Sequence, residues 1–451
     1  MTRLIRPGAR LVDAETGRIS DDPVRPEIYD GVPQGVVFLR ATTTVEAVKQ
    51  YLTAFETGRP LALLDPGLPD DTLADLVERY EPAAVLGPAP EAGLKGYHRQ
   101  SDHRWIRETP PETAPHPDLA VLLATSGSTG DPKLVRLSRR AVLANTAAII
   151  EALGITAADV AISALPFYYS YGMSVLNTHL AAGATFVVEA GGLLGRGFWS
   201  AVDRHGVTTL SLVPSQYDML LRLRFDPARH PALRTLTQAG GRLRPELVRE
   251  FHGRMAAAGG RLFVMYGQTE AGPRLTTLPA ERLADKPGSV GPAVPGGTLG
   301  IRLEDGTETT EPGVRGEVLY RGPNVMLGYA ETAADLARGD DQGGLLVTGD
   351  LGHLDADGYL FLDGRRKRFG KVSGVRLNLD DLERLLPGPA AAVAGDDRVL
   401  VFVTEGDPAE LRRTLAARLR LHWSGLEVRP IEALPLLRNG KIDYRALEEP
   451  R

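Results

Sequence analysis

The sequence contains no cysteine among its 451 residues, which excludes a disulfide framework, a thiolate metal site and a catalytic cysteine. The formal net charge is −5, so no overall positive field draws the chain to nucleic acid or to an anionic membrane. No apolar run reaches the roughly 18 residues of a membrane-spanning helix, and the first residues have no apolar core of signal-peptide length. These absences predict a cytoplasmic protein that binds neither nucleic acid nor membrane.

Lysine is scarce, because only seven of the 52 basic residues are lysines and the rest are arginines. The lysines are Lys49, Lys95, Lys133, Lys286, Lys367, Lys371 and Lys441. A lysine retained in such a chain is a candidate for a position that needs a compact ammonium group and not a planar guanidinium. Lys133, Lys367, Lys371 and Lys441 fall in glycine-rich or turn-rich segments, whereas we attribute the other three to chance.

The length and the order of elements predict an α/β protein with more than one domain. From residue 35 to 272, short apolar runs alternate with helix-like segments, which is typical of doubly wound, mostly parallel sheets. Ligands bind such sheets where loops leave the carboxyl ends of the strands. After residue 272, dense glycine and proline with short strands predict a small β-barrel-like region. We expect a large N-terminal domain over residues 1–366 and a small, mobile α+β domain over residues 367–451.

One stretch, Thr125–Lys133 (TSGSTGDPK), has the composition of a phosphate-binding loop. It follows the apolar run Leu119–Ala124, predicted as a buried strand, and precedes the predicted helix Ser138–Leu153. Glycines allow backbone N–H groups to surround an anion, hydroxyl groups add donors, and Lys133 adds a positive charge. The stretch lacks the GxxxxGK[ST] pattern of a Walker A loop. A surface loop with no ligand has a similar composition and is the less favoured alternative for this stretch alone.

Six further segments follow this stretch along the chain. They are Tyr266–Glu270 (YGQTE), Gly316–Glu317, Thr348–Asp350 (TGD), Gly364–Arg365, Lys371 with Gly374, and Asn439–Lys441 (NGK). Together with TSGSTGDPK, they resemble the ordered motifs of the adenylate-forming superfamily, which includes acyl-CoA synthetases, adenylation domains and luciferases. The resemblance covers roughly residues 119–447 and is greatest to the acyl-CoA ligases.

The resemblance implies a reaction in two steps. A carboxylic acid attacks the α-phosphate of ATP to give an acyl-adenylate and pyrophosphate, and a thiol then displaces AMP. Catalysis of the first step depends on positioning and on electrostatic stabilisation of the phosphates. We therefore expect an ATP- and Mg²⁺-dependent acid–thiol ligase whose thiol is coenzyme A. The phosphopantetheine of an acyl carrier protein is the alternative thiol.

By resemblance, the glycine-rich stretch would hold the β- and γ-phosphates. The residues concerned are Thr125, Ser126, Gly127, Ser128, Thr129, Gly130 and Lys133. Glu270 would bind Mg²⁺, a hard cation that prefers carboxylate and phosphate oxygens, and Thr269 would contribute to catalysis beside it. A solvated loop glutamate is the alternative interpretation of Glu270.

The resemblance also assigns a nucleoside site. The ring of Tyr266 would stack on adenine. A core aromatic is the less favoured alternative, and the two roles are compatible. Gly240 and Gly241 would let the backbone approach adenine closely, with Gly267 and Gln268 beside it. Asp350 and Arg365 would contact the ribose hydroxyls. An aspartate next to glycine is often only a turn former, so Asp350 alone would not identify the site.

Three lysines of the C-terminal segment have implied roles in the two steps. Lys441 would bridge the carboxylate and the α-phosphate during adenylation. A compact ammonium group suits that position better than the planar guanidinium group of an arginine. Lys367 occupies the position of the hinge about which the small domain would rotate. Lys371 would be presented in the second step, with a solvated basic run as the alternative.

The pocket for the acid is assigned to Tyr168, Tyr169, Ser215, Gly240 and Gly267. Tyr169 stands where many acyl-CoA synthetases have a histidine, and there is no aspartate near Tyr168 to pair with an α-ammonium group, which disfavours an amino acid. The tyrosines suggest an aromatic or medium-sized apolar acid, with polar tips available. Leu134 stands directly after Lys133, where the family usually has a glycine.

Three other functions remain open from the sequence. The chain could be a standalone adenylation enzyme that loads a carrier protein, a ligase that passes the adenylate to an amine, or an idle nucleotide-binding scaffold. Retention of Lys133, Glu270 and Lys441 together disfavours the scaffold. The identity of the acid and the choice between monomer and homodimer are not determined.

Overall fold

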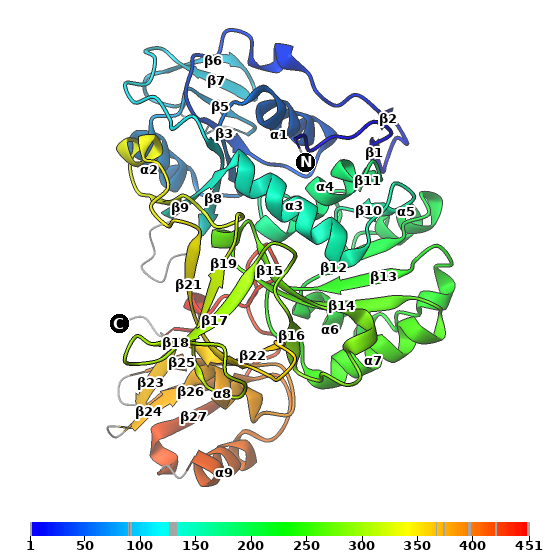
Figure 1. Cartoon of the computed structure of the whole chain (residues 1–451), viewed down its shortest axis with the longest axis vertical. Coiled ribbons are helices and arrows are strands. Elements are labelled where there is room, and N and C mark those ends of the chain that lie inside the picture. Colours follow the sequence, from blue (N-terminus) through cyan, green and yellow to red (C-terminus); the bar gives the residue numbers. More distant parts are fainter. Residues whose placement is uncertain are drawn as a thin grey trace.

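The structure of the protein is a computed structural model (Figure 1). It describes residues 2–88, 90, 93–125, 133–366, 368–372, 375–395, 398–419 and 422–448.

Two large sheets dominate the part before residue 300. The first has the strand order β20-β9-β8-β4-β3-β5-β7-β6, and its centre, from β8 to β5, is parallel. Its strands are β3 (Val37–Arg40), β4 (Leu61–Leu64), β5 (Ala84–Leu86), β6 (Tyr97–Ser101), β7 (Arg104–Arg107), β8 (Leu119–Thr125), β9 (Lys133–Ser138) and β20 (Gly328–Ala330).

The second sheet has the order β15-β14-β13-β12-β10-β11-β1-β2, and all of its pairs from β14 to β1 are parallel. Its strands are β1 (Arg10–Asp13), β2 (Ile19–Ser20), β10 (Val160–Ile162), β11 (Thr185–Val188), β12 (Thr209–Leu212), β13 (Thr235–Gln238), β14 (Arg261–Gly267) and β15 (Arg274–Leu278). Nearly all residues of β12 and β13 are buried, as expected for a parallel sheet covered on both faces.

Helices cover these sheets. They are α1 (Val45–Thr57), α2 (Asp70–Tyr80), α3 (Arg139–Leu153), α4 (Ser170–Ala181), α5 (Phe198–Arg204), α6 (Pro214–Arg222) and α7 (Pro245–Ala257). In Figure 1, α3 and α4 lie between the two sheets, and one hydrophobic cluster accordingly contains residues of both sheets and of these helices. Local sequence sets the helix ends: Ser138 caps the start of α3, and Gly154, with a φ of 63°, ends it.

A third sheet, β16-β22-β21-β19-β17-β18, is antiparallel and lies below the second in Figure 1. Its strands are β16 (Ser289–Gly291), β17 (Thr298–Arg302), β18 (Glu308–Thr309), β19 (Gly316–Arg321), β21 (Leu345–Leu354) and β22 (Leu360–Arg365). This sheet is the small β region that the sequence predicts after residue 272.

The C-terminal elements gather at the bottom of Figure 1 and have hydrophobic clusters of their own. They are the hairpin β23 (Phe369–Val372) and β24 (Val375–Asn378), the strands β25 (Ala390–Ala394), β26 (Val399–Val403) and β27 (Leu426–Pro430), and the helices α8 (Leu379–Arg384) and α9 (Pro408–Leu419). The domain boundary at 366/367 stays a prediction, and Lys367 lies outside the described residues.

The α/β class with mostly parallel sheets is confirmed. Within it, the glycine-rich stretch joins two antiparallel strands, because β9 follows it and pairs with β8 before α3 begins. The strand β9 is missing from our prediction, as are β1 and β25. Leu134, which departs from the motif, is fully buried in β9 and packs in a cluster with Leu122 and Ala330.

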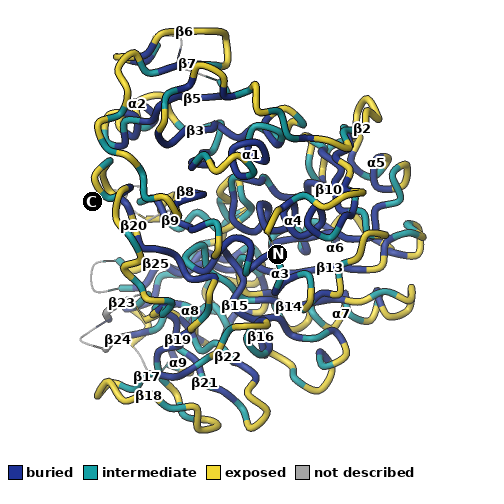
Figure 2. Tube along the Cα trace, turned by 45° about the horizontal axis from the view of Figure 1, so that its top comes forward, coloured by how far each residue is buried: buried dark blue, intermediate teal, exposed yellow. Residues whose placement is uncertain are grey.

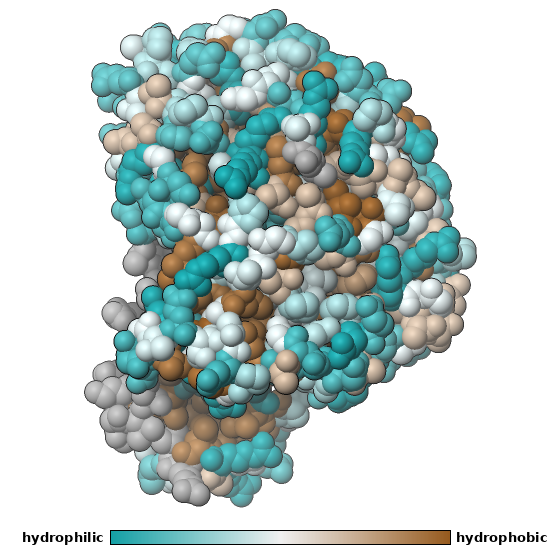
Figure 3. Space-filling model, viewed as in Figure 1, coloured by the Kyte–Doolittle hydropathy of each residue, from teal (hydrophilic) through white to brown (hydrophobic). Residues whose placement is uncertain are grey.

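Burial follows this layering. The central strands are dark blue in Figure 2, while loops and sheet edges are yellow. In Figure 3, hydrophilic residues cover most of the outline, and apolar residues show mainly towards the middle of that face. Within the described ranges, no helix is both long and apolar enough to cross a membrane.

Candidate functional site

Several of the predicted site residues lie together where β13 and β14 end. The strand β13 leads into Ala239–Gly241, and β14 ends in Tyr266 and Gly267. The first turns of α4 and α6 and the segment around Lys441 meet them there, as the contacts below show. This is the edge at which a mostly parallel sheet is expected to bind a ligand.

Four predicted residues form one polar cluster. The hydroxyl of Tyr266 donates a 2.5 Å hydrogen bond to Oδ2 of Asp350, and Nε2 of Gln268 donates a 2.7 Å hydrogen bond to the same oxygen. Nε of Arg365 lies 3.3 Å from Oδ1 of Asp350, because β21 and β22 place these two residues opposite each other. Burial and the carboxylate of Asp350 raise the pKa of Tyr266 well above its ordinary value. Asp350 is thus held at a fixed position with Arg365 open to solvent beside it.

Tyr266 is also part of the core, since its ring packs against the clusters of the third sheet. A core role and a stacking role are therefore compatible. Gly267 has a separate reason to be glycine, because a Cβ atom there would collide with the carbonyl oxygen of Pro273.

Glu270 and Thr269 lie in a short 3-10 turn, Thr269–Ala271. Oε1 of Glu270 accepts a 2.8 Å hydrogen bond from the hydroxyl of Tyr329, and no described residue donates to Oε2. The hydroxyls of Thr269 and Ser170 are 3.1 Å apart, which ties this turn to the start of α4. Glu270 is therefore positioned through one oxygen and has the other available for a ligand.

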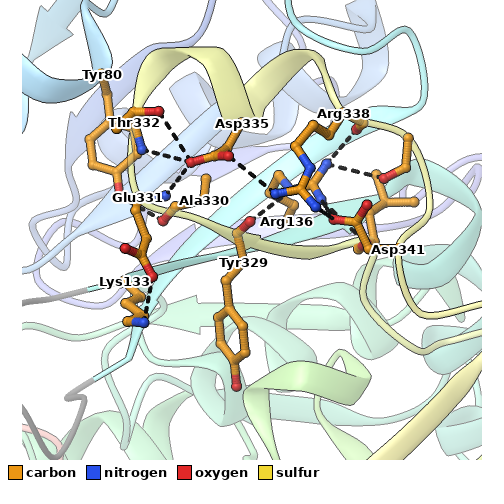
Figure 4. Close-up of polar contacts among 12 residues, drawn as sticks. Tyr80, Lys133, Arg136, Tyr329, Ala330, Glu331, Thr332, Asp335, Arg338 and Asp341 are labelled. Carbon is orange, nitrogen blue, oxygen red and sulfur yellow. Dashed lines mark hydrogen bonds and ion pairs between the residues drawn. The ribbon is translucent and has the colours of Figure 1, made fainter.

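Lys133 forms an ion pair with Glu331, shown by a dashed line in Figure 4. Glu331 directly follows β20, whose last residue, Ala330, is paired with Leu134 of β9, so Glu331 lies next to Lys133 at the start of β9. Neither Glu331 nor Tyr329 is among the residues predicted from the sequence.

Arg136 anchors the segment that carries these two partners. Its side chain is fully buried and donates to the carbonyl oxygens of Leu327, Tyr329, Arg338 and Gly339, and its Nη2 lies 2.5 Å from Oδ2 of Asp341 (Figure 4). The arginine of β9 thereby fixes residues 327–341 beside Lys133 and Glu270.

Lys441 reaches the site from the C-terminal segment. Its Nζ lies 5.1 Å from the centre of the Tyr169 ring, a cation–π distance. The preceding residue, Gly440, accepts a 2.7 Å hydrogen bond at its carbonyl oxygen from the hydroxyl of Ser215 in α6. Gly440 has a φ of 79°, and a Cβ atom there would approach Val213 to 2.6 Å. Glycine is therefore required for this turn to dock.

The ammonium group of Lys441 is electrostatically unusual. Lys441 as a whole is exposed to solvent, although protein groups around its ammonium nitrogen reduce the hydration of that nitrogen. This partial desolvation lowers the pKa of Lys441 to about 8, with a further lowering by Arg365 and an opposing effect of Glu270. Lys441, Arg365 and Glu270 are thus close enough to influence one another.

The two tyrosines assigned to the acid pocket, Tyr168 and Tyr169, have different surroundings. Tyr169 lies against Gly240, where any Cβ atom would collide with its hydroxyl group, and it contacts the ring of Tyr171 edge-on at 6.3 Å. Tyr168 faces the other way, where Asp65 and Arg438 influence its pKa, which burial raises.

Some predicted residues fall outside this geometry. Ser126, Gly127, Ser128, Thr129 and Gly130 lie outside the described residues. Thr125 is described only as the last residue of β8, opposite Lys133, and Lys371 only as a backbone position of β23. Gly241 follows Gly240 and packs on Pro214. The assigned roles of all these residues stay predictions.

Comparison of the sequence with known proteins matches it to a protein family. Residues 30–330 match the family described as AMP-binding enzyme. The indoleacetate–CoA ligase of Aromatoleum aromaticum is 34% identical over 351 residues, which are 74% of this chain and 67% of that protein. The sulfoacetate–CoA ligase of Cupriavidus necator is 31% identical over the same shares of the two chains. The chain thus spans about two thirds of the length of these curated relatives.

Among solved structures, the O-succinylbenzoate coenzyme A synthetase of Bacillus subtilis, in complex with ATP and magnesium ion, has a similar fold. The TM-score is 0.73 at 23% identity, and the match covers 92% of this chain and 90% of that one. At this identity the likeness concerns the fold.

Proposed function

The chain belongs to the AMP-binding enzyme family, and from this premise we propose that it activates a carboxylic acid with ATP and transfers the acyl group to coenzyme A. In the first step, a carboxylate oxygen bonds to the α-phosphorus of ATP and pyrophosphate leaves. In the second, a thiolate attacks the carbonyl carbon and AMP leaves. The family assignment and the CoA ligases among the relatives support this reaction.

The observation that carries the proposal is the position of Lys441. Gly440 is docked on Ser215, and the ammonium group of Lys441 lies over Tyr169 with Glu270 and Arg365 in its electrostatic range. An incompletely hydrated cation within electrostatic range of Arg365 and Glu270 is suited to stabilise the negative charge that the carboxylate and the α-phosphate share while the bond between them forms. No idle scaffold needs such an arrangement.

The described residues also fit magnesium. The carboxylate of Glu270 is fixed by Tyr329 through Oε1, and Oε2 is available as a hard oxygen ligand. When bound with ATP, magnesium would neutralise phosphate charge. The remaining coordination would come from phosphate oxygens and water, as is usual for this ion.

The nucleoside would lie against the cluster of Tyr266, Gln268, Asp350 and Arg365. Asp350 Oδ1 is not used by Tyr266 or Gln268 and can accept from a ribose hydroxyl, while Arg365 can donate. Lys133 would bind phosphate by exchanging its ion pair with Glu331 for the ligand. Lys367 and Lys371 would act in the rotation and in thioester formation.

The acceptor is proposed to be coenzyme A, since the relatives reported above are CoA ligases. Loading of a carrier protein is the alternative, because both acceptors present the same thiol. A cytoplasmic location stays a prediction. Relatives that act on acids as different as indoleacetate and sulfoacetate leave the acid itself undetermined by family membership.

The test is ATP–pyrophosphate exchange with a panel of aryl, short-chain, medium-chain and amino acids, followed by addition of coenzyme A. We expect exchange with one class of acid and AMP-forming thioester synthesis on addition of the thiol. Lys441→Ala should slow exchange about 100- to 1,000-fold, as for loss of one preorganised donor to the transition state. Binding of ATP without exchange for any acid would refute the proposal.

A further inference from the structure

A second buried arginine, Arg274, lies at the start of β15 and points away from solvent. The residue is only 2% exposed, and its Nε has no hydrogen-bond partner. Across the described residues, no hydrogen bond or ion pair to its guanidinium group is present. Within the described ranges, its guanidinium group has a cation–π contact with the ring of Tyr171, whose centre lies 4.9 Å from Cζ.

The backbone of Arg274 is held rigidly, in contrast to its unpaired side chain. The buried amide of Asn145 donates to its carbonyl oxygen at 2.9 Å and accepts from its N–H at 3.0 Å. Asn324 donates a 3.1 Å hydrogen bond to the same carbonyl. Three hydrogen bonds from two buried asparagines thus hold the backbone of Arg274. A backbone held in this way is typical of a preorganised binding group.

Arg136 shows what a purely structural buried arginine looks like in this chain. It is as enclosed as Arg274, but it has the carboxylate of Asp341 and several carbonyl oxygens as partners. Burial of a charge is costly unless a counter-charge or hydrogen bonds compensate it. Arg274 therefore lacks the anionic partner that its environment calls for.

The cavity around Arg274 offers no such partner. It is small, about 20 Å³, and the residues that line it include Tyr171, Ser174, Ser211, Thr237 and Asp159. The carboxylate of Asp159 accepts hydrogen bonds from Thr156 and Thr208 and makes no ion pair with Arg274. The hydroxyl of Tyr171 bonds with that of Thr237 at 2.7 Å, which in turn donates to Ser211.

Arg274 is connected to the reaction site by two aromatic rings. Lys441 lies over Tyr169, Tyr169 contacts Tyr171 edge-on, and Arg274 lies over Tyr171. The two tyrosines thus have one cation at each end. An acid whose body packs along these rings would place one end near Lys441 and the other near Arg274.

We propose that Arg274 binds a second carboxylate at the far end of the acid, so that the substrate is a dicarboxylic acid with an aromatic or aliphatic body. This inference rests on the proposed function and specifies its substrate class. A guanidinium group matches a carboxylate through two parallel hydrogen bonds, and a site built for such a group strongly rejects an analogue that lacks it.

The test compares diacids with monoacids of the same skeleton in ATP–pyrophosphate exchange. Suitable pairs are adipate and hexanoate, glutarate and pentanoate, succinate and butyrate, and 4-carboxyphenylacetate and phenylacetate. In the best pair, we expect kcat/KM for the diacid to exceed that for the monoacid at least 100-fold. Equal or better activity with the monoacid in every pair would overturn the inference and leave the proposed function intact.

Variants test whether Arg274 causes the preference for a diacid over its monoacid. Arg274→Met should lower kcat/KM for the diacid about 100-fold or more and change the monoacid only a few-fold, whereas an equal loss for both would contradict the inference. Arg274→Lys keeps the positive charge but cannot form two parallel hydrogen bonds to a carboxylate, so the preference for the diacid should remain but be smaller. Arg261→Met is the matched control, because Arg261 lines the same cavity but already donates to Leu153 and Thr235. It should leave the diacid-to-monoacid ratio unchanged.

Calorimetric binding without ATP separates this inference from the proposed function. If no acid supports exchange, tighter binding of a diacid than of its monoacid, lost in Arg274→Met, would still establish the subsite. Absence of that difference in binding would overturn it. The wild-type comparison needs no variant and is therefore independent of any folding defect.

Discussion

The hydroxyl of Ser215 donates a 2.7 Å hydrogen bond to the carbonyl oxygen of Gly440, 225 positions later in the chain. A second contact, 3.4 Å between Nη1 of Arg438 and Oδ1 of Asp65, holds the same C-terminal turn to the loop after β4. The turn that carries Lys441 is therefore attached at two points to the part of the chain that holds the residues proposed to bind the nucleotide. This attachment is what brings the ammonium group of Lys441 to Tyr169.

Loss of the Ser215 contact should weaken the first step selectively. In Ser215→Ala, we expect ATP–pyrophosphate exchange to fall about 5- to 10-fold, the value of one neutral hydrogen bond. Transfer of a preformed acyl-adenylate to coenzyme A should be unchanged, since the rotation proposed for that step would release the turn. Ser200→Ala, on the exposed face of α5, is the control and should behave as wild type. An equal loss in both steps would contradict this assignment.

The hydroxyl of Tyr266 should affect ATP binding independently of its ring. Tyr266→Phe keeps the ring packing but removes the donor to Asp350, so the carboxylate loses one of the two hydrogen bonds to its Oδ2 and keeps its contacts with Gln268 and Arg365. We expect KM for ATP to rise about 5- to 10-fold with a smaller change in kcat. Tyr320→Phe, which removes the buried hydroxyl bonded to Asn324, is the control. It should lower stability without a change in KM for ATP.

Sequence reasoning located the elements whose signals are local. The end of β14 at Tyr266 and Gly267, the TGD segment with Asp350, and Lys441 all follow from short motifs. It missed Arg136 and Arg274, because arginine side chains are mostly exposed and the strands that carry these two, β9 and β15, were not predicted. Their burial depends on partners far away in the sequence, such as the segment 327–341 that covers Arg136. Such contacts leave no local periodicity.

Arg136 should be important for stability. Arg136→Met leaves Asp341 and several carbonyl oxygens of residues 327–339 without their donor, so we expect a loss of about 3 kcal/mol in the free energy of unfolding. Chemical denaturation measures it. Arg338→Met is the control, because its ion pairs with Asp335 and Asp341 are at the surface and should contribute at most about 1 kcal/mol. Similar losses in both variants would show that Arg136 does not anchor this segment.

The lowered pKa of Lys441 should appear in the pH dependence of adenylation. The ammonium form is the active one and is present below a pKa of about 8, so kcat/KM, which reports the free enzyme, should fall about tenfold per pH unit above pH 8. At saturating ATP, the phosphate charges favour the ammonium form, and the decline in kcat should move to higher pH. Lys441→Arg should be slower but should lack the decline, because a guanidinium group stays charged throughout this range. Persistence of the same decline in the arginine variant would assign it to another group and remove Lys441 as its cause.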